Sequence, residues 1–426
     1  MALNYIWAAF FLIAFGIAIF KTFMAGWFGM ETDPEIFAKI MHTVFDRAKL
    51  GFELSLYLTG VLALWMGIMK IGEKSGMIDK LATLVRPFFK KIFPGIPEHH
   101  PAHGAMMMNF SANMLGLDNA ATPLGLKAMK ELQSLNPQKD TASDAQIMFL
   151  VLNTSGLTLI PVSILALRAA HHSANPTDVF VPILLATFIS TLAGLLLTMY
   201  IQLKNPVKWL AWLIHPVTLL YLGGAVALIG ALIWYLNGMT PDEINRFTNI
   251  LSNALLFAVI ALFIGVGLWS KISVYDAFIE GAKGGFDVAV TIIPYLVAML
   301  TAIGAFTASG AMDFLLDGFR SFFGLFFHDL RFVDALPTAF LKPLTGGGAR
   351  AAMIESWEQF GVDSFVGHLT SVLQGSTETT FYVLAVYFGS VGIKKVRYAV
   401  WAGLFADLAG IIAAILLSYY FFGHLP

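Results

Sequence analysis

The sequence predicts an all-α polytopic membrane protein, arranged as an inverted repeat with two re-entrant hairpins and interrupted helices. Three observations lead to this fold class. Of the 426 residues, 58% are hydrophobic and 12% are charged, about half the charged fraction of a typical soluble protein. Apolar runs of about 20 residues recur along the whole chain, as membrane-spanning helices require. Finally, the chain contains a second copy of one of its own segments.

The repeat is visible when the chain is compared with itself. Residues 43–89 align without a gap with residues 277–323, and twelve pairs are identical, including Gly51 with Gly285. The carboxylates Glu53 and Asp287 also match in charge. Shared membrane composition is the simpler explanation, but agreement of charged and glycine positions over 47 residues argues against it. Two related halves are typical of transporters whose binding site lies between them.

We expect nine membrane crossings. In chain order they are residues 5–24, 52–71, 146–167, 179–202, 209–236, 251–269, 288–307, 369–389 and 398–422. The first is expected to be a retained helix, because it lacks the basic start and the cleavage site of a secretory signal.

Two further apolar segments are too irregular to cross the membrane directly. Residues 104–129 contain three asparagines and Pro123, and residues 336–354 contain two prolines and three consecutive glycines. Irregular backbone survives at membrane depth only where protein or a watery cavity surrounds it, so both segments are predicted to be re-entrant hairpins. Each follows an amphipathic segment, 78–92 or 312–326, which we expect at the membrane interface.

The distribution of basic residues gives the orientation. With the N-terminus inside, sixteen lysines and arginines fall on the inner side and eight on the outer side, with Lys342 and Arg350 of the second hairpin left uncounted, as the positive-inside rule requires. The C-terminus then lies outside. Five crossings separate the two copies, and since five is odd the copies run in opposite directions. We divide the chain into a first repeat, 1–205, and a second repeat with one extra helix, 206–426.

Composition excludes several classes of function. The net charge of −1 gives no reason to expect a nucleic-acid partner, and the absence of cysteine excludes disulfides and thiolate metal ligands. His99, His100 and His103 lack a fixed helical spacing, so we predict no metal site. The histidines fall near the ends of crossings, where none can act as base for a buried nucleophile. We therefore expect no enzymatic activity and no organic cofactor.

The first hairpin carries candidate binding residues. Asn109, Asn113 and Asn119 lie within eleven residues, and a buried asparagine without a partner costs a few kcal/mol. Their partners are a ligand, an ion or the backbone of the hairpin itself. Asp118 either binds a cation or caps the half-helix that follows.

A second set of polar residues interrupts the crossing after each hairpin. With an offset of 221, Asn153, Ser155 and Thr158 align with Gln374, Ser376 and Thr379, and the second run also contains Thr377 and Glu378. An unwound helix at such a place frees carbonyls for cations and N–H groups for anionic ligand groups. Packing of Ser and Thr between helices is the structural alternative.

Two acids lie inside predicted crossings, and intramembrane acids by default suggest a role in coupling or transport. Glu378 would hold Na⁺, carry a proton or bind an ammonium group, with an ion pair to Arg350 as the alternative. Asp407 would serve either in an ion pair or in transport. The run Gly346, Gly347 and Gly348 would supply either a nest of backbone amides, aided by Arg350, or flexibility for gating.

These motifs resemble a known family. Residues 113–129 are similar to spore maturation protein A, and residues 342–350, 374–382 and 387–392 are similar to spore maturation protein B, as if the two were joined. Both belong to the nucleoside recognition, or gate-domain, group, which includes concentrative nucleoside transporters. The resemblance implies paired re-entrant hairpins, each followed by an interrupted helix, around a central site. Asp118 departs from the family motif, which has glycine there.

We therefore expect a transporter of a small polar solute (a nucleoside, an amino acid or a similar zwitterion) in the bacterial inner membrane. It would work by alternating access, coupled to Na⁺ or H⁺ through Glu378, Asp118 and Asp407, in the lipid bilayer and as a homo-oligomer. The alternative is a non-transporting membrane protein that acts in envelope or spore maturation. A transporter should have an aqueous cavity ending at Asn153 and Gln374, whereas a scaffold should have these side chains bonded to one another.

Overall fold

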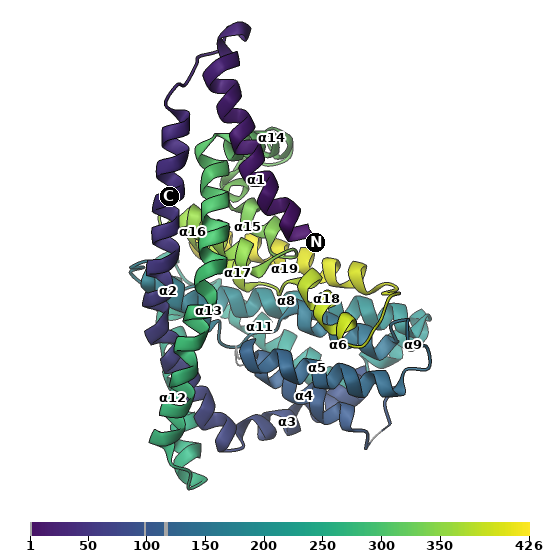
Figure 1. The fold of residues 1–426 in the computed structure, drawn as a ribbon. Coiled ribbons are helices and arrows are strands. Elements are labelled where there is room, and N and C mark those ends of the chain that lie inside the picture. The colour runs from purple at the N-terminus through teal and green to yellow at the C-terminus, as the bar shows by residue number, and fades with distance from the viewer. Residues whose placement is uncertain (1, 98, 115–117) are drawn as a thin grey trace.

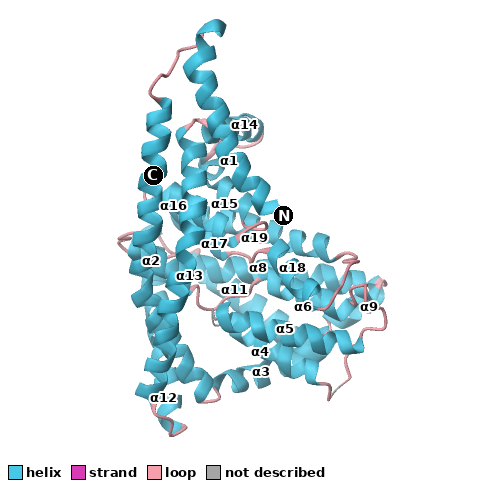
Figure 2. Cartoon of the chain, in the orientation of Figure 1, coloured by secondary structure: helices cyan, strands magenta, loops and turns pink. Residues whose placement is uncertain are grey.

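The computed structural model describes residues 2–97, 99–114 and 118–426, and most of them are helical (Figures 1 and 2). Within these ranges the only extended pairing is an isolated bridge between Thr141 and Lys395. The predicted all-α class is therefore confirmed.

The first half contains α1 (Ala2–Ile19), α2 (Ile36–Lys74), α3 (Met77–Ile92), α4 (Pro101–Met114), α5 (Asp118–Leu135), α6 (Asp144–Ser155), α7 (Val162–Ala170) and α8 (Phe180–Leu203). The second half contains α9 (Pro206–Leu213), α10 (Pro216–Thr218), α11 (Gly224–Leu236), α12 (Pro241–Trp269), α13 (Val274–Ala308), α14 (Ala311–Phe323), α15 (Leu336–Leu341), α16 (Gly346–Phe360), α17 (Phe365–Gly375), α18 (Thr380–Ser390) and α19 (Ala399–Phe422). Short π and 3₁₀ turns follow α1, join α10 to α11 and precede α15.

Six helical segments of the described chain are long and apolar enough to cross a membrane, which confirms a multi-pass membrane protein. Part of α13 together with α14, bent by 71°, would make a seventh. Counting the interrupted pairs α6–α7 and α17–α18 as well gives the predicted nine. That count and the sidedness of the termini stay predictions.

Helices α2 and α13, which contain most of the repeated segment, pack against each other along their lengths (Figure 1). A Cβ atom at Gly51 would lie 3.1 Å from the backbone nitrogen of Val297, and one at Gly285 would lie 2.5 Å from the backbone of Ala63. Gly51 matches Gly285 in the repeat, and Ala63 matches Val297. The contact of Gly51 with Val297 is therefore equivalent to the contact of Gly285 with Ala63. Because the two equivalent contacts run in opposite directions along the chain, the copies are antiparallel and related by a pseudo-twofold axis.

A second antiparallel pair follows the interrupted helices. Helix α8 packs against α19, and Cβ atoms built on Gly194 and Gly410 would lie 2.9 Å from Cβ of Ala406 and 3.1 Å from Cβ of Ser190. The Ser190 hydroxyl also donates to the carbonyl of Ala406 at 2.9 Å. The pair α8–α19 runs across the direction of α2–α13 (Figure 1). Helices α6, α17 and α18 pack against this second pair, and α7 packs against α2.

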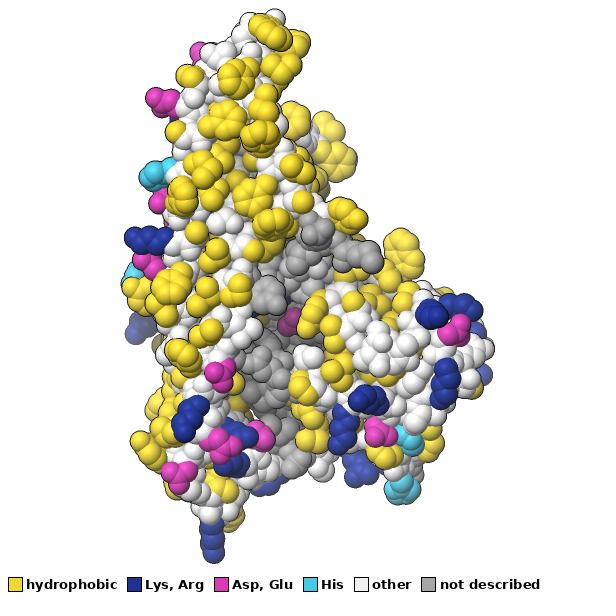
Figure 3. Space-filling view, in the orientation of Figure 1, with side chains coloured by type: hydrophobic (Ala, Val, Ile, Leu, Met, Phe, Trp, Pro, Cys, Tyr) yellow, Lys and Arg dark blue, Asp and Glu magenta, His cyan; other side chains and the backbone are white. Residues whose placement is uncertain are grey.

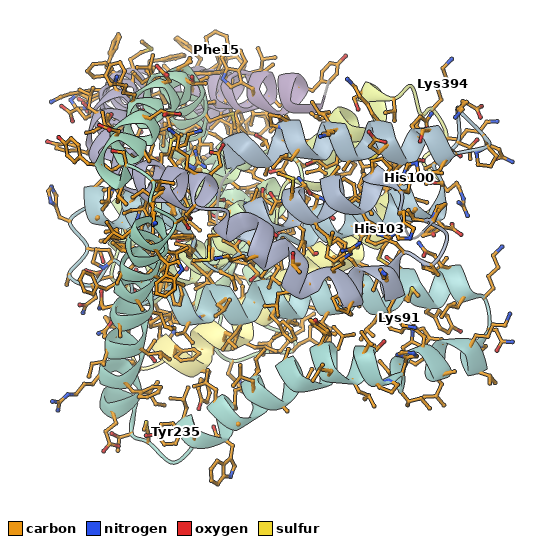
Figure 4. All side chains as sticks on the ribbon, turned by 90° about the horizontal axis from the view of Figure 1, so that it is seen from below. Phe15, Lys91, His100, His103, Tyr235 and Lys394 are labelled. Atoms are coloured by element: carbon orange, nitrogen blue, oxygen red, sulfur yellow. The ribbon has the colours of Figure 1, made fainter. Side chains whose placement is uncertain are left out.

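The surface matches this arrangement. Apolar side chains cover the column formed by α1 and α2, while charged side chains gather along its edge and at the far end of the molecule (Figure 3). Lys91, His100 and Lys394 lie toward one end, and Phe15 and Tyr235 lie toward the other (Figure 4). The predicted layout requires Lys91 and Lys394 on the same side.

Candidate functional site

Both predicted interruptions are present. Helix α6 ends at Ser155 and α7 begins at Val162, whereas α17 ends at Gly375 and α18 begins at Thr380. Gly156 opens the first break with φ +56°, a left-handed conformation that glycine adopts without strain. The two breaks lie within the polar runs that the sequence singled out.

Each break is bonded to the hairpin of its own half. The N–H of Leu159, in the first break, donates to the carbonyl of Met114 at the end of α4, with N···O 2.7 Å. The N–H of Phe381, just after the second break, donates to the carbonyl of Pro343 between α15 and α16, with N···O 3.0 Å. The helical hairpins α4–α5 and α15–α16 therefore occupy equivalent places in the two halves.

The two breaks also meet each other. The N–H of Glu378 donates to the carbonyl of Thr154 at 2.7 Å. A Cβ atom at Gly156 would lie 2.8 Å from Cγ of Glu378, so the glycine is required for this approach as well as for its positive φ. The junction thus uses backbone groups that an uninterrupted helix would have consumed.

In the first half the amide side chains form a network. Asn113 donates to Oδ1 of Asn153 at 2.7 Å, and Asn153 donates to the carbonyl of Phe149 at 2.8 Å. Asn109 donates to the carbonyl of Ala121 at 2.8 Å. Asn113 and Asn153 thus meet directly, and the hairpin's own backbone is among the partners of Asn109.

Tyr387 of α18 joins this network and was missed by the sequence reasoning. Its hydroxyl accepts from Asn109 at 3.3 Å and donates to Oδ1 of Asn153 at 3.2 Å. A Cβ atom at Gly125 would lie 2.1 Å from that hydroxyl, so Gly125 allows the tyrosine to enter. Tyr387 belongs to one of the motifs that carry the family resemblance, which was the available signal.

In the second half the corresponding groups are less completely bonded. Gln374 donates to the carbonyl of Gly346 at 3.4 Å, and its Oε1 has no hydrogen-bond partner among the described residues. The hydroxyl of Thr377 likewise has none there. Thr379 lies against the hairpin, 2.9 Å from the position of a Cβ atom on Gly346. Buried polar atoms without partners require an explanation, and a ligand is one.

Three other predicted binding residues are bonded locally. The hydroxyls of Ser155 and Ser376 donate to the carbonyls of Leu152 and Leu373, at 3.3 and 2.9 Å, and Thr158 donates to the carbonyl of Gly156 at 2.8 Å. Such bonds to the preceding turn are ordinary for Ser and Thr in helices. These hydroxyls keep lone pairs but no free proton.

The glycine run of the second hairpin differs from the expected loop. Gly346, Gly347 and Gly348 form the first turn of α16, and Thr345 caps it by accepting from the N–H of Gly348 at 3.2 Å. Arg350 follows in the same helix. The run is therefore regular helix, and of the three glycines it is Gly346 that lies against the second break, at Thr379.

The acids occupy different environments. Glu378 is partly exposed beside Gly156, whereas Asp407 is 1% exposed and accepts from the Thr380 hydroxyl at 2.7 Å. Asp118 and Asn119 begin α5, and the predictions on their side chains lie outside the described residues.

The junction is closed in this structure. Asn153 and Gln374 are each 5% exposed, where a water-filled cavity was expected to end. An open hollow of about 570 Å³ lies elsewhere, lined by residues of the loop before α15 and by Arg320 of α14.

A buried ion cluster joins the halves beside the first interrupted helix. Arg168, at the end of α7, is fully buried, and its Nη2 lies 3.1 Å from carboxylate oxygens of both Asp178 and Asp363. His368 contacts Asp178 at 2.9 Å. Burial alone would raise the pKa of Asp363, but the N–H of Ala174, a nearby hydroxyl and Arg168 together hold that pKa below its ordinary value.

Comparison with known proteins agrees with this architecture. The family described as nucleoside recognition (Gate) matches residues 55–170 and 289–394, together more than half of the chain. The two matches begin 234 residues apart, which is the offset of the internal repeat.

Two curated relatives each correspond to part of the chain. Spore maturation protein A of Bacillus subtilis (strain 168) is 43% identical over 169 residues, which cover 40% of this chain and 86% of that protein. Spore maturation protein B of the same organism is 43% identical over 175 residues, which cover 41% of this chain and 97% of that protein. No solved structure matches the chain. With two matched regions, each built as hairpin and broken helix, the chain belongs to the nucleoside recognition (Gate) family.

Proposed function

We propose that this protein transports a small polar solute, a nucleoside, an amino acid or a similar zwitterion, across the bacterial inner membrane by alternating access. The observation that carries the proposal is the junction at which two broken helices from antiparallel halves meet through Glu378 and Thr154. Broken helices at the interface of inverted repeats are the usual place for substrate and coupling ions in secondary transporters.

The chemistry of the junction suits a solute with both donors and acceptors. Oε1 of Gln374 and the hydroxyl of Thr377 have no partner among the described residues, and the carboxylate of Glu378 lies beside them in the chain. An incoming amide, hydroxyl or ammonium group would satisfy these atoms. The closed junction corresponds to an occluded state, and the hairpins α4–α5 and α15–α16 would open it in turn. Movement of Na⁺ or H⁺ would be coupled through acids at this site.

The direct test is ligand-dependent stability. The purified protein is heated in the presence of nucleosides, amino acids, and sodium or choline chloride, and ligand hits are then followed as flux into liposomes. A ligand at 100 times its dissociation constant stabilises the folded state by about 2.7 kcal/mol, which is readily measured. If no compound shifts the unfolding temperature and none crosses the liposome membrane, the transport proposal is wrong.

Glu378→Gln sharpens the test because it keeps the side-chain shape and removes the charge. We expect the variant to fold normally and to lose the dependence of binding and flux on the cation. Glu73→Gln, at an exposed carboxylate of α2 that pairs with Lys70, is the matched control and should behave as wild type. Normal ion-dependent flux by Glu378→Gln would contradict the coupling role.

A second function is favoured by one observation. Asn113, Asn153 and Tyr387 form one hydrogen-bonded network, so these polar side chains are satisfied without a ligand. That would suit a membrane scaffold that acts in envelope or spore maturation without transport, although the bond between Asn153 and Gln374 expected of a scaffold is not the one formed, because Gln374 donates to the carbonyl of Gly346. A scaffold should tolerate Glu378→Gln, so full complementation of a deletion strain by that variant, together with absence of flux, would favour this function.

A further inference from the structure

Asp407 is a buried carboxyl group that the junction described above does not use. It lies in α19 and is 1% exposed, and its Oδ2 accepts from the hydroxyl of Thr380, the first residue of α18, at 2.7 Å. Its Oδ1 has no hydrogen-bond partner among the described residues. The hydroxyl of Thr377 also lies near this carboxyl group, without the geometry of a full hydrogen bond. A buried charge with only neutral hydroxyl donors is expensive, and intramembrane acids of this kind mark ion or proton pathways.

The packing around Asp407 is tight on both sides. Gly403 and Gly410 lie one turn before and one turn after it on the same face of α19. Cβ atoms at these positions would lie 2.8 Å from Cγ2 of Thr380 and 2.6 Å from Cγ2 of Thr377. Ca²⁺ and Mg²⁺ need about six oxygen ligands arranged around them, whereas a proton needs one unoccupied carboxyl oxygen. The geometry therefore favours a proton over a divalent metal ion.

Two charged groups act on Asp407 from neighbouring elements. Lys342, 5% exposed and placed directly after α15, attracts the carboxylate, and Glu378 in the second break repels it. Helix α8, which packs against α19 on another side, contains no charged residue. Lys342 is adjacent to Pro343, whose carbonyl is bonded by Phe381. Thr380, which donates to Asp407, is adjacent to Phe381, so two hydrogen bonds connect Asp407 to the turn of the second hairpin.

We propose that Asp407 is a proton-binding site that controls the α15–α16 hairpin. A hydronium ion gives its proton to Oδ1 of the carboxylate, which yields the neutral acid and one water molecule. Loss of the negative charge removes the attraction on Lys342, and the hairpin is released. This deepens the proposed function, on which it rests in treating α15–α16 as a gate, and it adds Asp407 as a proton-binding acid beside the cation-coupling carboxylate of Glu378.

Infrared difference spectroscopy tests proton binding without any solute. Spectra of the purified protein are compared between neutral and acidic buffer for wild type and Asp407→Asn, with Glu73→Gln as control. We expect Asp407→Asn to lose one carboxylic-acid C=O band that wild type and the control retain. Identical difference spectra would overturn the proposal. Asp407→Glu, which keeps a titratable group, is the second variant if Asp407→Asn fails to fold, and its band should be present at a shifted position.

Thiol labelling tests release of the hairpin. The chain contains no cysteine, and Cβ atoms at Gly347 and Gly389 would meet nothing within 4 Å, so Gly347→Cys reports on the hairpin and Gly389→Cys is the reference. We expect Asp407→Asn and Lys342→Gln each to raise the Gly347→Cys rate, relative to the reference, by about fivefold or more, a typical coupling between sites. Unchanged ratios would overturn the link to the hairpin.

These outcomes are independent of the transport assay. A lost carboxyl band in a protein that moves no solute would leave the proton site standing and remove the proposed function. If the protein moves solute but wild type and Asp407→Asn give the same infrared difference spectrum, the proposed function stands and the proton site at Asp407 is wrong.

Discussion

Two clusters hold the halves together at equivalent places but in different surroundings. The Arg168 cluster (Arg168, Asp178, Asp363 and His368) joins the segment after α7 to the segment before α17. The Arg397 cluster (Asp140, Asp144, Lys395 and Arg397) joins the segment after α18 to the segment before α6. The pseudo-twofold axis therefore relates one cluster to the other.

Their difference lies in burial. The side chain of Arg168 is fully buried, whereas Arg397 is 35% exposed and its partner Asp144 is 45% exposed. A buried ion pair cannot lose one partner without leaving an unpaired charge in the interior, but an exposed pair is replaced by water. The comparison indicates that the buried Arg168 cluster holds one end of the junction more strongly than the exposed Arg397 cluster holds the opposite end. We therefore expect the junction to open first at the Arg397 cluster.

The largest effect is expected from Arg168→Met. The substitution leaves Asp178 and Asp363 facing each other without the guanidinium. Breaking a fully buried ion pair costs about 3–5 kcal/mol, and the cost here should be below that because Asp178 is 17% and Asp363 39% exposed to solvent. The measurement is the unfolding temperature of the purified protein in detergent. Arg168→Lys should recover part of the loss, and a variant as stable as wild type would show that the cluster does not lock the halves.

The contact between α2 and α13 provides a reference where the two halves are alike. Gly51→Ala and Gly285→Ala should each destabilise the protein by about 1–3 kcal/mol, because the added methyl overlaps backbone of the partner helix. Gly285→Ala should cost more, since its contact is 2.5 Å against 3.1 Å.

Gly60→Ala is the matched control in α2. A Cβ atom there would meet nothing within 4 Å, so the helix gains up to about 1 kcal/mol of propensity without a clash. Loss of stability in Gly60→Ala comparable to that of Gly51→Ala would mean that helix propensity, and not the contact between the halves, controls the result.

Acid should weaken the Arg168 cluster. The pKa of Asp363 is held below its ordinary value by bonds that exist in the folded state. The carboxylate therefore stabilises the folded protein above its unfolded-state pKa of about 4, and this contribution is lost as pH falls through the lower folded-state pKa. The difference in unfolding temperature between wild type and Asp363→Asn should be present at pH 6 and should shrink steadily as the pH is lowered below the unfolded-state pKa of about 4.

The smallest effect is expected from Arg397→Met. Exposed ion pairs contribute about 0.2–1 kcal/mol, so the unfolding temperature should move little. If the variant is instead as unstable as Arg168→Met, the two ends are equivalent and the inferred order of opening fails.

Much of the architecture could be predicted from the sequence because it depends on local composition. The breaks follow from consecutive polar residues such as Asn153-Thr154-Ser155 inside apolar helices, and the antiparallel copies follow from the repeat and an odd number of crossings. The closed junction could not be predicted, since composition does not state which side chains satisfy one another. Glycine at 346–348 suggested an irregular loop, but there the lack of side chains serves close packing within a helix.

The residues that the sequence analysis did not identify, Tyr387 and Arg168, both have partners far away in the sequence. Tyr387 reaches Asn109 across 278 residues, and Arg168 reaches Asp363 across 195. Spacing along the chain carries no information about such partners. Asp407 was noticed because an acid inside an apolar helix is conspicuous, but its bond to Thr380 required the packing of α19 against the second break.

The two equivalent contacts, Gly51 with Val297 and Gly285 with Ala63, bear on how the duplicated chain evolved. Such a surface is complementary to itself, as in a twofold homodimer. A lone ancestral unit could use it only if some molecules entered the bilayer one way up and others the opposite way. Joining two units into one polypeptide removes that requirement provided the connection reverses the second unit, and each copy is then free to change on its own.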